Sequence, residues 1–225
     1  MRLPDYMKKR LFLLFLAAFL PSLAQLLAYY IGSYGFGLIV RIVFHIIIPV
    51  ITVAYVSKVS LKESFVLPLQ LKNKKNILLL ALLCSIATIV IIVSALFIFR
   101  NFFGFKDIAN SLNYNLNKQT YFFVALAIVF INPFMEEYFW RGFVFRVFDK
   151  YWTGYWTGIL FSLHHSVIIF YWFSLREFLL VLVFLSIIGI FFNWLYKQTG
   201  SIYASLIIHF VADLTIVIIG WIYLF

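Results

Sequence analysis

The chain has 225 residues, of which 65% are hydrophobic and only 12% are charged. A soluble domain is about half apolar and about one quarter charged, so this composition excludes a water-soluble globule. The formal net charge of +10 is not gathered into a patch that would bind a duplex, and we expect no nucleic-acid partner. Apolar runs of about 20 residues instead predict an all-α fold, a polytopic transmembrane helical bundle embedded in the lipid bilayer.

Seven spans are predicted along the chain. They cover residues 11–31, 36–57, 77–99, 120–145, 154–172, 176–196 and 202–224. The first run continues too far, without a convincing cleavage site, to be a signal peptide. Residues 57–76, SKVSLKESFVLPLQLKNKKN, are too polar to span and are expected to form an interfacial helix and a loop. No repeat or linker divides the chain, so residues 1–225 are expected to form a single integral-membrane domain.

The distribution of basic residues predicts the orientation. With the N-terminus in the cytoplasm, thirteen Lys and Arg residues lie in inside segments and four in outside segments. The positive-inside rule therefore predicts a cytoplasmic N-terminus and places the acidic motif of the fourth span toward the cytoplasm. The short length and the Phe-, Ile- and Lys-rich composition favour a bacterial plasma membrane.

Three clusters of ionisable residues lie inside predicted spans, where each such group costs roughly 2.5–3.5 kcal/mol on insertion scales. They are Glu136 and Glu137 with Arg141, His164 with His165, and His209 with Asp213. Because of this cost, intramembrane ionisable groups are treated as functional candidates.

Helix geometry separates the two adjacent glutamates. Glu137 and Arg141 are four residues apart and are expected to form a structural ion pair on one face. Glu136 is rotated by about 100° and is expected to be unpaired and to face a cavity, with Arg146 as the alternative structural partner. Pro133 is expected to kink this helix just before the glutamates.

Two kinds of chemistry remain open for these residues. A carboxylate in an apolar cavity suits a general base, and imidazoles from two other helices could position a water and stabilise charge on a carbonyl oxygen. The residues concerned could instead hold a divalent metal such as zinc, since two histidines and a carboxylate are a common zinc set. That set would be Glu136, His165, His209 and Asp213, although the consecutive HExxH spacing is absent.

Other buried polar residues have simpler interpretations. His164 is expected to be a packing residue or to support the site from behind. Arg41 and His45 lie four residues apart in the second span and could line a pore, but we expect them to face the bundle or to extend toward the interface.

Three short motifs occur in order on separate apolar segments: EEYFWR at residues 136–141, FSLHH at 161–165 and HFVAD at 209–213. With this pattern, EExxxR, FxxxH and HxxxD, residues 120–220 resemble the CAAX-protease and bacteriocin-processing intramembrane endopeptidases, the CPBP or Abi family. The resemblance implies a protease that hydrolyses a peptide bond in a small membrane-associated or prenylated peptide.

The same resemblance implies roles for individual residues. Glu136 would activate water, His165 and His209 would be catalytic, and Glu137 would pair with Arg141. Asp213 stands where better-known members carry asparagine, so it would be protonated, orient His209, or ligate a metal; we favour the first two roles.

Two other functional classes compete with a protease. A non-proteolytic immunity or scaffold protein of the same fold would not need the three motifs together. A proton-coupled transporter is disfavoured because no paired halves with matching broken helices are visible.

Overall fold

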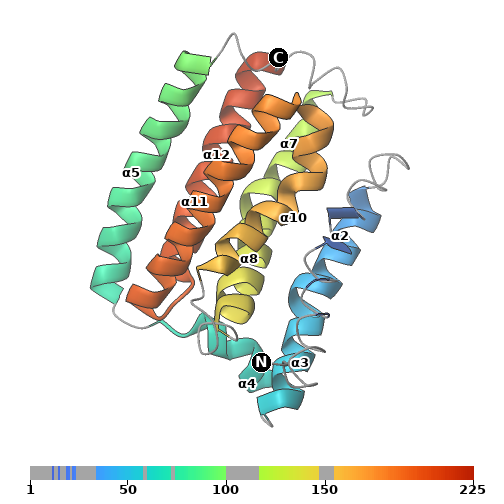
Figure 1. Cartoon of the computed structure of the whole chain (residues 1–225), viewed down its shortest axis with the longest axis vertical. Coiled ribbons are helices and arrows are strands. Elements are labelled where there is room, and N and C mark those ends of the chain that lie inside the picture. Colours follow the sequence, from blue (N-terminus) through green and yellow to red (C-terminus); the bar gives the residue numbers. More distant parts are fainter. Residues whose placement is uncertain are drawn as a thin grey trace.

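The computed structural model describes residues 34–57, 60–71, 74–99, 117–146 and 155–225, together with Phe12, Phe15, Phe19, Leu20, Ser22 and Leu23. These segments are helical and contain no strand (Figure 1), so the predicted all-α class is confirmed. Apart from the isolated positions, the predicted first span lies outside the described residues.

The described elements follow one another as α2 (Tyr34–Ile42), η1 (Val43–Ile47), α3 (Ile48–Ser57), α4 (Leu61–Val66), η2 (Leu67–Leu69), α5 (Lys74–Phe99), α7 (Lys118–Leu126), η3 (Ala127–Ile131), α8 (Asn132–Glu137), η4 (Tyr138–Phe145), α10 (Trp156–Trp172), α11 (Leu175–Thr199) and α12 (Tyr203–Leu224). Elements η1, η3 and η4 are π-helical and η2 is a 3₁₀ turn. Elements α2, η1 and α3 form one continuous helix, and α7, η3, α8 and η4 form another.

Five helical stretches among the described residues are long and apolar enough to cross a membrane. They are Phe36–Tyr55, Ile77–Phe97, Lys118–Phe145, Leu175–Thr199 and Tyr203–Leu224. Helix α10, where a further span was predicted, has 17 residues, which is at the lower limit for crossing a bilayer. The protein is therefore an integral membrane protein with a helical bundle.

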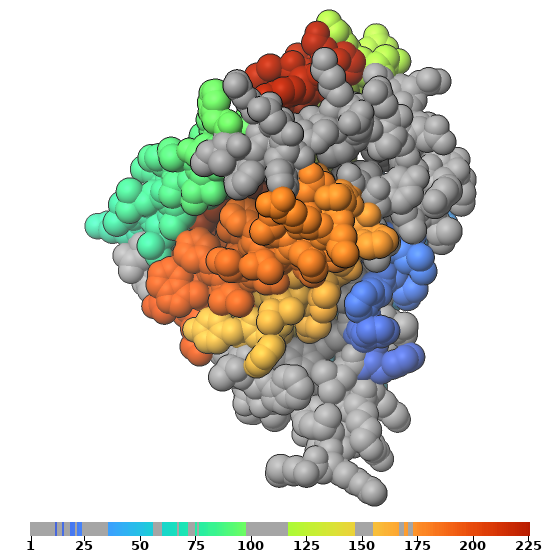
Figure 2. Space-filling model, turned by 45° about the horizontal axis from the view of Figure 1, so that its top comes forward, coloured from blue at the N-terminus to red at the C-terminus, as the bar shows by residue number. Residues whose placement is uncertain are grey.

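The helices run roughly along the long axis of the molecule, with α5 at one edge and the α2–α3 helix at the other (Figure 1). Helix α4 crosses one end of the bundle, which we call the α4 end; η4 and α11 end there, and α10 and α12 begin there. On the face drawn in Figure 2, α10 and α11 form a continuous surface beside α5.

Burial differs sharply between helices. Every residue from Met135 to Phe145 is buried, whereas α5 exposes apolar side chains such as Leu78 and Leu82, at 63% and 60%. In a membrane protein, this apolar surface contacts lipid. The segment of residues 135–145, which begins just before the two glutamates, is thus the buried centre of the bundle.

Helices α10 and α11 cross at two glycines. A Cβ atom on Gly158 would lie 2.4 Å from the Ile190 nitrogen, and one on Gly189 would lie 2.5 Å from the Gly158 oxygen. Small residues at helix crossings let the backbones approach closely in a membrane. No larger residue fits at this crossing unless the two helices move apart.

The helix around Pro133 departs from α-helical geometry where a kink was predicted. The π-helical turn η3 ends two residues before Pro133, which has no N–H to donate to an intrahelical bond. A second π-helical segment, η4, begins directly after Glu137. Such π-turns are frequent at functional sites, and here they bracket the two glutamates.

Candidate active site

Glu136 is buried in α8 and is paired with an arginine from another helix. Its Oε1 atom lies 2.6 Å from Arg41 Nη2, and the side chain is 2% exposed. The prediction that Glu136 is unpaired is therefore wrong. The alternative partner is wrong too, because Arg146 is exposed beyond the end of η4. Helical periodicity could not reveal this pair, because the two residues are 95 positions apart.

The other carboxylate oxygen of Glu136 faces two imidazoles. Glu136 Oε2 lies 3.5 Å from His165 Nε2 and 3.9 Å from His209 Nε2. It has no hydrogen-bond partner among the described residues. Helices α8, α10 and α12 thus bring the three motif residues around one buried oxygen.

The backbone determines which nitrogen of His165 carries a proton. His165 Nδ1 lies 2.9 Å from the Phe161 carbonyl oxygen, four residues earlier in α10. A carbonyl only accepts, so Nδ1 is the donor, and in a neutral imidazole Nε2 is then an acceptor. An ionised Glu136 and a neutral His165 therefore present two acceptors to each other, an arrangement that a bridging water with two O–H donors satisfies.

Glu137 joins Arg141 to His209. Glu137 Oε1 lies 2.9 Å from Arg141 Nη1, and both side chains are fully buried. The same oxygen lies 2.8 Å from His209 Nδ1. Since a carboxylate accepts, His209 Nδ1 donates, and its Nε2 atom turns toward Glu136.

Arg141 also contacts residues of two other helices, although its Nε atom has no hydrogen-bond partner among the described residues. Besides Glu137, it donates from Nη2 to the Gly189 carbonyl oxygen at 3.3 Å. Its guanidinium carbon lies 4.6 Å from the centre of the Phe161 ring and 4.9 Å from that of Phe192, within the range of cation–π attraction. The Arg141 contacts therefore connect η4 to α10 and α11.

Asp213 lies beside His209 but also contacts a residue that the sequence did not single out. Its Oδ1 atom is 3.8 Å from His209 Nε2, and its Oδ2 atom is 3.4 Å from Asn132 Nδ2. Asn132 Oδ1 in turn accepts a hydrogen bond from Arg41 Nη2. Arg41, Asn132 and Asp213 thus form a chain across α2, α8 and α12.

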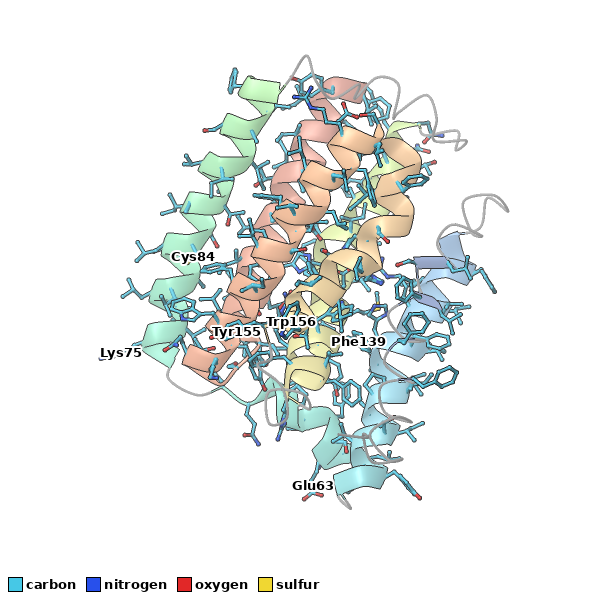
Figure 3. The ribbon with its side chains drawn as sticks, viewed as in Figure 1. Glu63, Lys75, Cys84, Phe139, Tyr155 and Trp156 are labelled. Carbon is cyan, nitrogen blue, oxygen red and sulfur yellow. The ribbon has the colours of Figure 1, made fainter. Side chains whose placement is uncertain are left out.

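His164 and His45 pack together behind the site. Their ring centres are 5.3 Å apart, and both side chains are buried. His164 Nδ1 lies 2.9 Å from Ser22 Oγ, and His45 Nδ1 lies 3.1 Å from the Arg41 carbonyl oxygen. Phe139, which points from η4 toward the α2–α3 helix (Figure 3), covers the His45 ring at 4.9 Å. Of the two expectations for Arg41 and His45, the structure shows the one in which they face the bundle.

The part of the chain that carries the three motifs is similar to a known protein family. Residues 118–215 match the family model described as type II CAAX prenyl endopeptidase Rce1-like. Over this range, the chain matches the CAAX-protease family. All three motifs lie inside it, so the resemblance predicted from them is confirmed. No curated protein and no solved structure matches the chain significantly.

One group of side chains near Glu136 could hold a metal ion, and it overlaps the predicted set in part. Within the described part of the chain, one group offers three ligand atoms that all lie within 4.8 Å of one another: Glu136, His164 and His165. Two nitrogens and an oxygen suit zinc. This group shares Glu136 and His165 with the predicted set and adds His164, the neighbour of His165 in α10, whereas His209 and Asp213 are not part of it.

Two residues of the site lie outside the CAAX-protease motifs. Arg41 also lies outside the matched range, whereas Asn132 lies inside it. For Asn132 the sequence carried a usable signal, because it is four residues before Glu136 and so shares its helix face. For Arg41 the only signal was the cost of an arginine in an apolar span.

Proposed function

We propose that this protein is a CAAX-type intramembrane endopeptidase that hydrolyses a peptide bond in a small membrane-associated or prenylated peptide, with Glu136 activating the attacking water. The observation that carries the proposal is the convergence of His165 Nε2, at 3.5 Å, and His209 Nε2, at 3.9 Å, on Glu136 Oε2. The family match supports endopeptidase activity at the level of the family.

In the proposed first step, a water binds between Glu136 Oε2 and His165 Nε2 and donates a hydrogen bond to each. Its lone pairs then point away from both acceptors, toward the substrate carbonyl carbon. As the new C–O bond forms, Glu136 takes one proton from the water and the carbonyl π electrons move onto the carbonyl oxygen. Proton transfer to a positioned carboxylate of this kind contributes about 100- to 10,000-fold to a rate.

His209 is proposed to stabilise the resulting oxyanion. The site contains three carboxylates, from Glu136, Glu137 and Asp213, and two guanidinium groups, from Arg41 and Arg141. One further positive charge, on a protonated His209, would make the site neutral. With Nδ1–H donating to Glu137, the Nε2–H of this imidazolium is available to the oxyanion.

The tetrahedral intermediate then collapses. Glu136 returns its proton to the amide nitrogen, the C–N bond breaks, and the electrons on the oxyanion re-form the carbonyl. The products are a carboxylic acid and an amine, and Glu136 is again a base. In this scheme Asp213 orients His209, because its Oδ2 oxygen already accepts from Asn132 Nδ2 and its Oδ1 oxygen faces the imidazole.

A divalent metal, where the enzyme uses one, would be held by Glu136, His164 and His165. It would supply Lewis-acid activation of the same water. The residue roles of Glu137, Arg141 and His209 are the same in both forms of the chemistry.

The test is cleavage by the purified protein in proteoliposomes. The probe is a quenched-fluorescent peptide that ends in a prenylated Cys-a-a-X sequence, and the same peptide without the prenyl group is measured beside it. We expect the parent to cleave the prenylated peptide and Glu136→Gln to lose at least about 100-fold in kcat/KM.

Glu177→Gln is the matched control, because Glu177 caps the exposed N-terminus of α11 through Ser174 and lies outside the site. It should cleave like the parent. Absence of cleavage of either peptide by the parent, or equal turnover by Glu136→Gln, would contradict the proposal and favour a non-proteolytic immunity or scaffold protein.

A further inference from the structure

Arg41 is a charged residue within the apolar α2–α3 helix, where a lipid environment disfavours charge. It lies in a stretch that is apolar enough to span, and its side chain is only 12% exposed. An arginine at such a depth is costly unless it is paired inside the protein. The Arg41 guanidinium is directed into the candidate site, toward α8.

One nitrogen of Arg41 serves two acceptors on α8. Arg41 Nη2 carries two hydrogens; it donates to Glu136 Oε1 at 2.6 Å and also to Asn132 Oδ1. Asn132 and Glu136 are four residues apart, so one guanidinium reaches both from the same side. The pairing restrains Glu136 through Oε1, which leaves Oε2 as the oxygen turned toward the imidazoles.

The same contact determines the orientation of the Asn132 amide. A guanidinium cannot accept a hydrogen bond, so the amide oxygen of Asn132 must face Arg41 and its NH₂ group must face the other way. That NH₂ group lies 3.4 Å from Asp213 Oδ2, on α12. Hydrogen bonds therefore connect Arg41 on α2, through Asn132 on α8, to Asp213, which lies beside His209.

We propose that Arg41 and Asn132 are positioning residues of the catalytic centre: Arg41 orients the Glu136 carboxylate, and Asn132 connects the same guanidinium to Asp213. The proposal rests on the proposed endopeptidase function. It assigns to α2, which lies outside the matched family range, a part in aligning the base with the two histidines.

The first experiment removes the positive charge of Arg41. Arg41→Met keeps the length of the side chain and removes its charge, and Arg41→Lys keeps the charge with a different donor geometry. We expect kcat toward the prenylated peptide to fall about 100-fold in Arg41→Met with KM within about threefold, because a small displacement of the base affects chemistry more than binding. Arg41→Lys should recover at least about a tenth of the parent kcat.

Arg146→Met is the matched control, since Arg146 is exposed at the end of η4. It should leave kcat unchanged. If Arg41→Met lowers only the yield or melting temperature while the folded protein keeps the parent kcat, Arg41 is merely structural and the proposal fails.

The second experiment exchanges the two partners of the Asn132–Asp213 contact. Asn132→Asp alone places two carboxylates against each other and should lower kcat about 100-fold. Adding Asp213→Asn restores one carboxylate and one amide in reversed order, with residue 132 still accepting from Arg41. The double variant should regain at least tenfold over Asn132→Asp, by the same positioning argument. A double variant no more active than Asn132→Asp would overturn the connection.

Failure of this inference can be told from failure of the proposed function. A parent protein that cleaves neither peptide contradicts the function. The contact itself is then tested by melting the single and double variants in detergent. If Asn132→Asp is destabilised and the added Asp213→Asn change does not restore its melting temperature, the connection is refuted without any activity measurement.

Discussion

Arg41 Nη2 and Glu136 Oε1 lie 2.6 Å apart and join residues separated by 95 positions in the chain. The adjacent Glu137 is paired with Arg141, one turn further along its own helix. Two neighbouring carboxylates therefore have different arginine partners. One pair is completed by a second helix, and the other is complete within the helix that carries it.

This difference predicts different losses for the two glutamine variants. Glu136→Gln should abolish cleavage and leave the protein folded, because it removes a base and little volume, and Asn132 still accepts from Arg41. Glu137→Gln should be destabilised by about 3 kcal/mol, because it leaves the buried Arg141 without a carboxylate. It should also lower cleavage, because a glutamine oxygen still accepts from His209 Nδ1 but no longer supplies the negative charge that stabilises a protonated His209.

Thermal melting in detergent, with cleavage measured on the folded fraction, compares the two variants. If Glu136→Gln melts at a lower temperature than Glu137→Gln, the base and the structural partner have been assigned the wrong way round.

Asp213→Asn tests whether Asp213 orients His209 or helps to hold a metal. We expect the variant to keep more than about a tenth of the parent kcat/KM, a loss below about 1.4 kcal/mol. The asparagine oxygen can accept from Asn132, and its NH₂ group is an amide donor that can act on the oxyanion in place of the lost charge. We expect a chelator to leave the parent activity unchanged.

Purified parent and variant are assayed with and without chelator, beside elemental analysis. Stoichiometric zinc in the active parent that disappears together with activity in Asp213→Asn would refute the orienting role and make the protein a metalloprotease.

The orientation of the bundle in the membrane is predicted from its charges. Glu63 and Lys75 lie at the α4 end of the molecule (Figure 3), where Lys62, Arg146 and Lys197 also occur on elements that begin or end there. The positive-inside rule places this end in the cytoplasm. Reporter fusions at Gly200 should therefore be active in the cytoplasm, and fusions at Ser174 or after Phe225 should be active outside.

The C-terminal fusion is the informative one, because its side depends on the number of spans before it. Activity of that fusion in the cytoplasm alone would show that either the orientation or the odd number of spans is wrong.

The glycine crossing between α10 and α11 predicts a graded effect of added methyl groups. Gly189→Ala would place Cβ 2.5 Å from the Gly158 carbonyl oxygen, a backbone atom that cannot move alone, and should cost about 1–3 kcal/mol. It should also weaken the bond from Arg141 to the Gly189 oxygen.

Gly220→Ala is the matched control. Its Cβ would meet the Tyr121 hydroxyl at 2.3 Å, but this is the end of a side chain rather than a backbone atom, and it can move away at the loss of one hydrogen bond to the Val217 oxygen. Detergent melting should rank Gly189→Ala well below Gly220→Ala. Equal melting temperatures would mean that the crossing is not a tight constraint.

Local spacing predicted the parts of this structure that depend on one helix at a time. Hydrophobic length identified the five spans that the described residues contain, and the four-residue interval between Glu137 and Arg141 corresponds to a contact of 2.9 Å. The order of the three motifs was sufficient to identify the family match.

Contacts between helices were beyond that reasoning. Helical periodicity shows which residues share a face, but not which other helix that face meets. The Arg41 pair, the bond from Asn132 to Asp213 and the place of His164 beside Glu136 all depend on how α2, α8, α10 and α12 pack. The prediction for Glu136 is wrong because its partner, Arg41, lies on a different helix.

The distribution of the site over separate helices has a consequence for biosynthesis. Glu137 and His209, which share a hydrogen bond, are 72 residues apart, so the ribosome completes the helix with both glutamates well before it has made α12. A partly inserted chain holds the base without the imidazole that faces it. Under the proposed function, the nascent protein is therefore unable to cut neighbouring membrane proteins while it is being inserted, and hydrolytic competence arises only when the late helix docks.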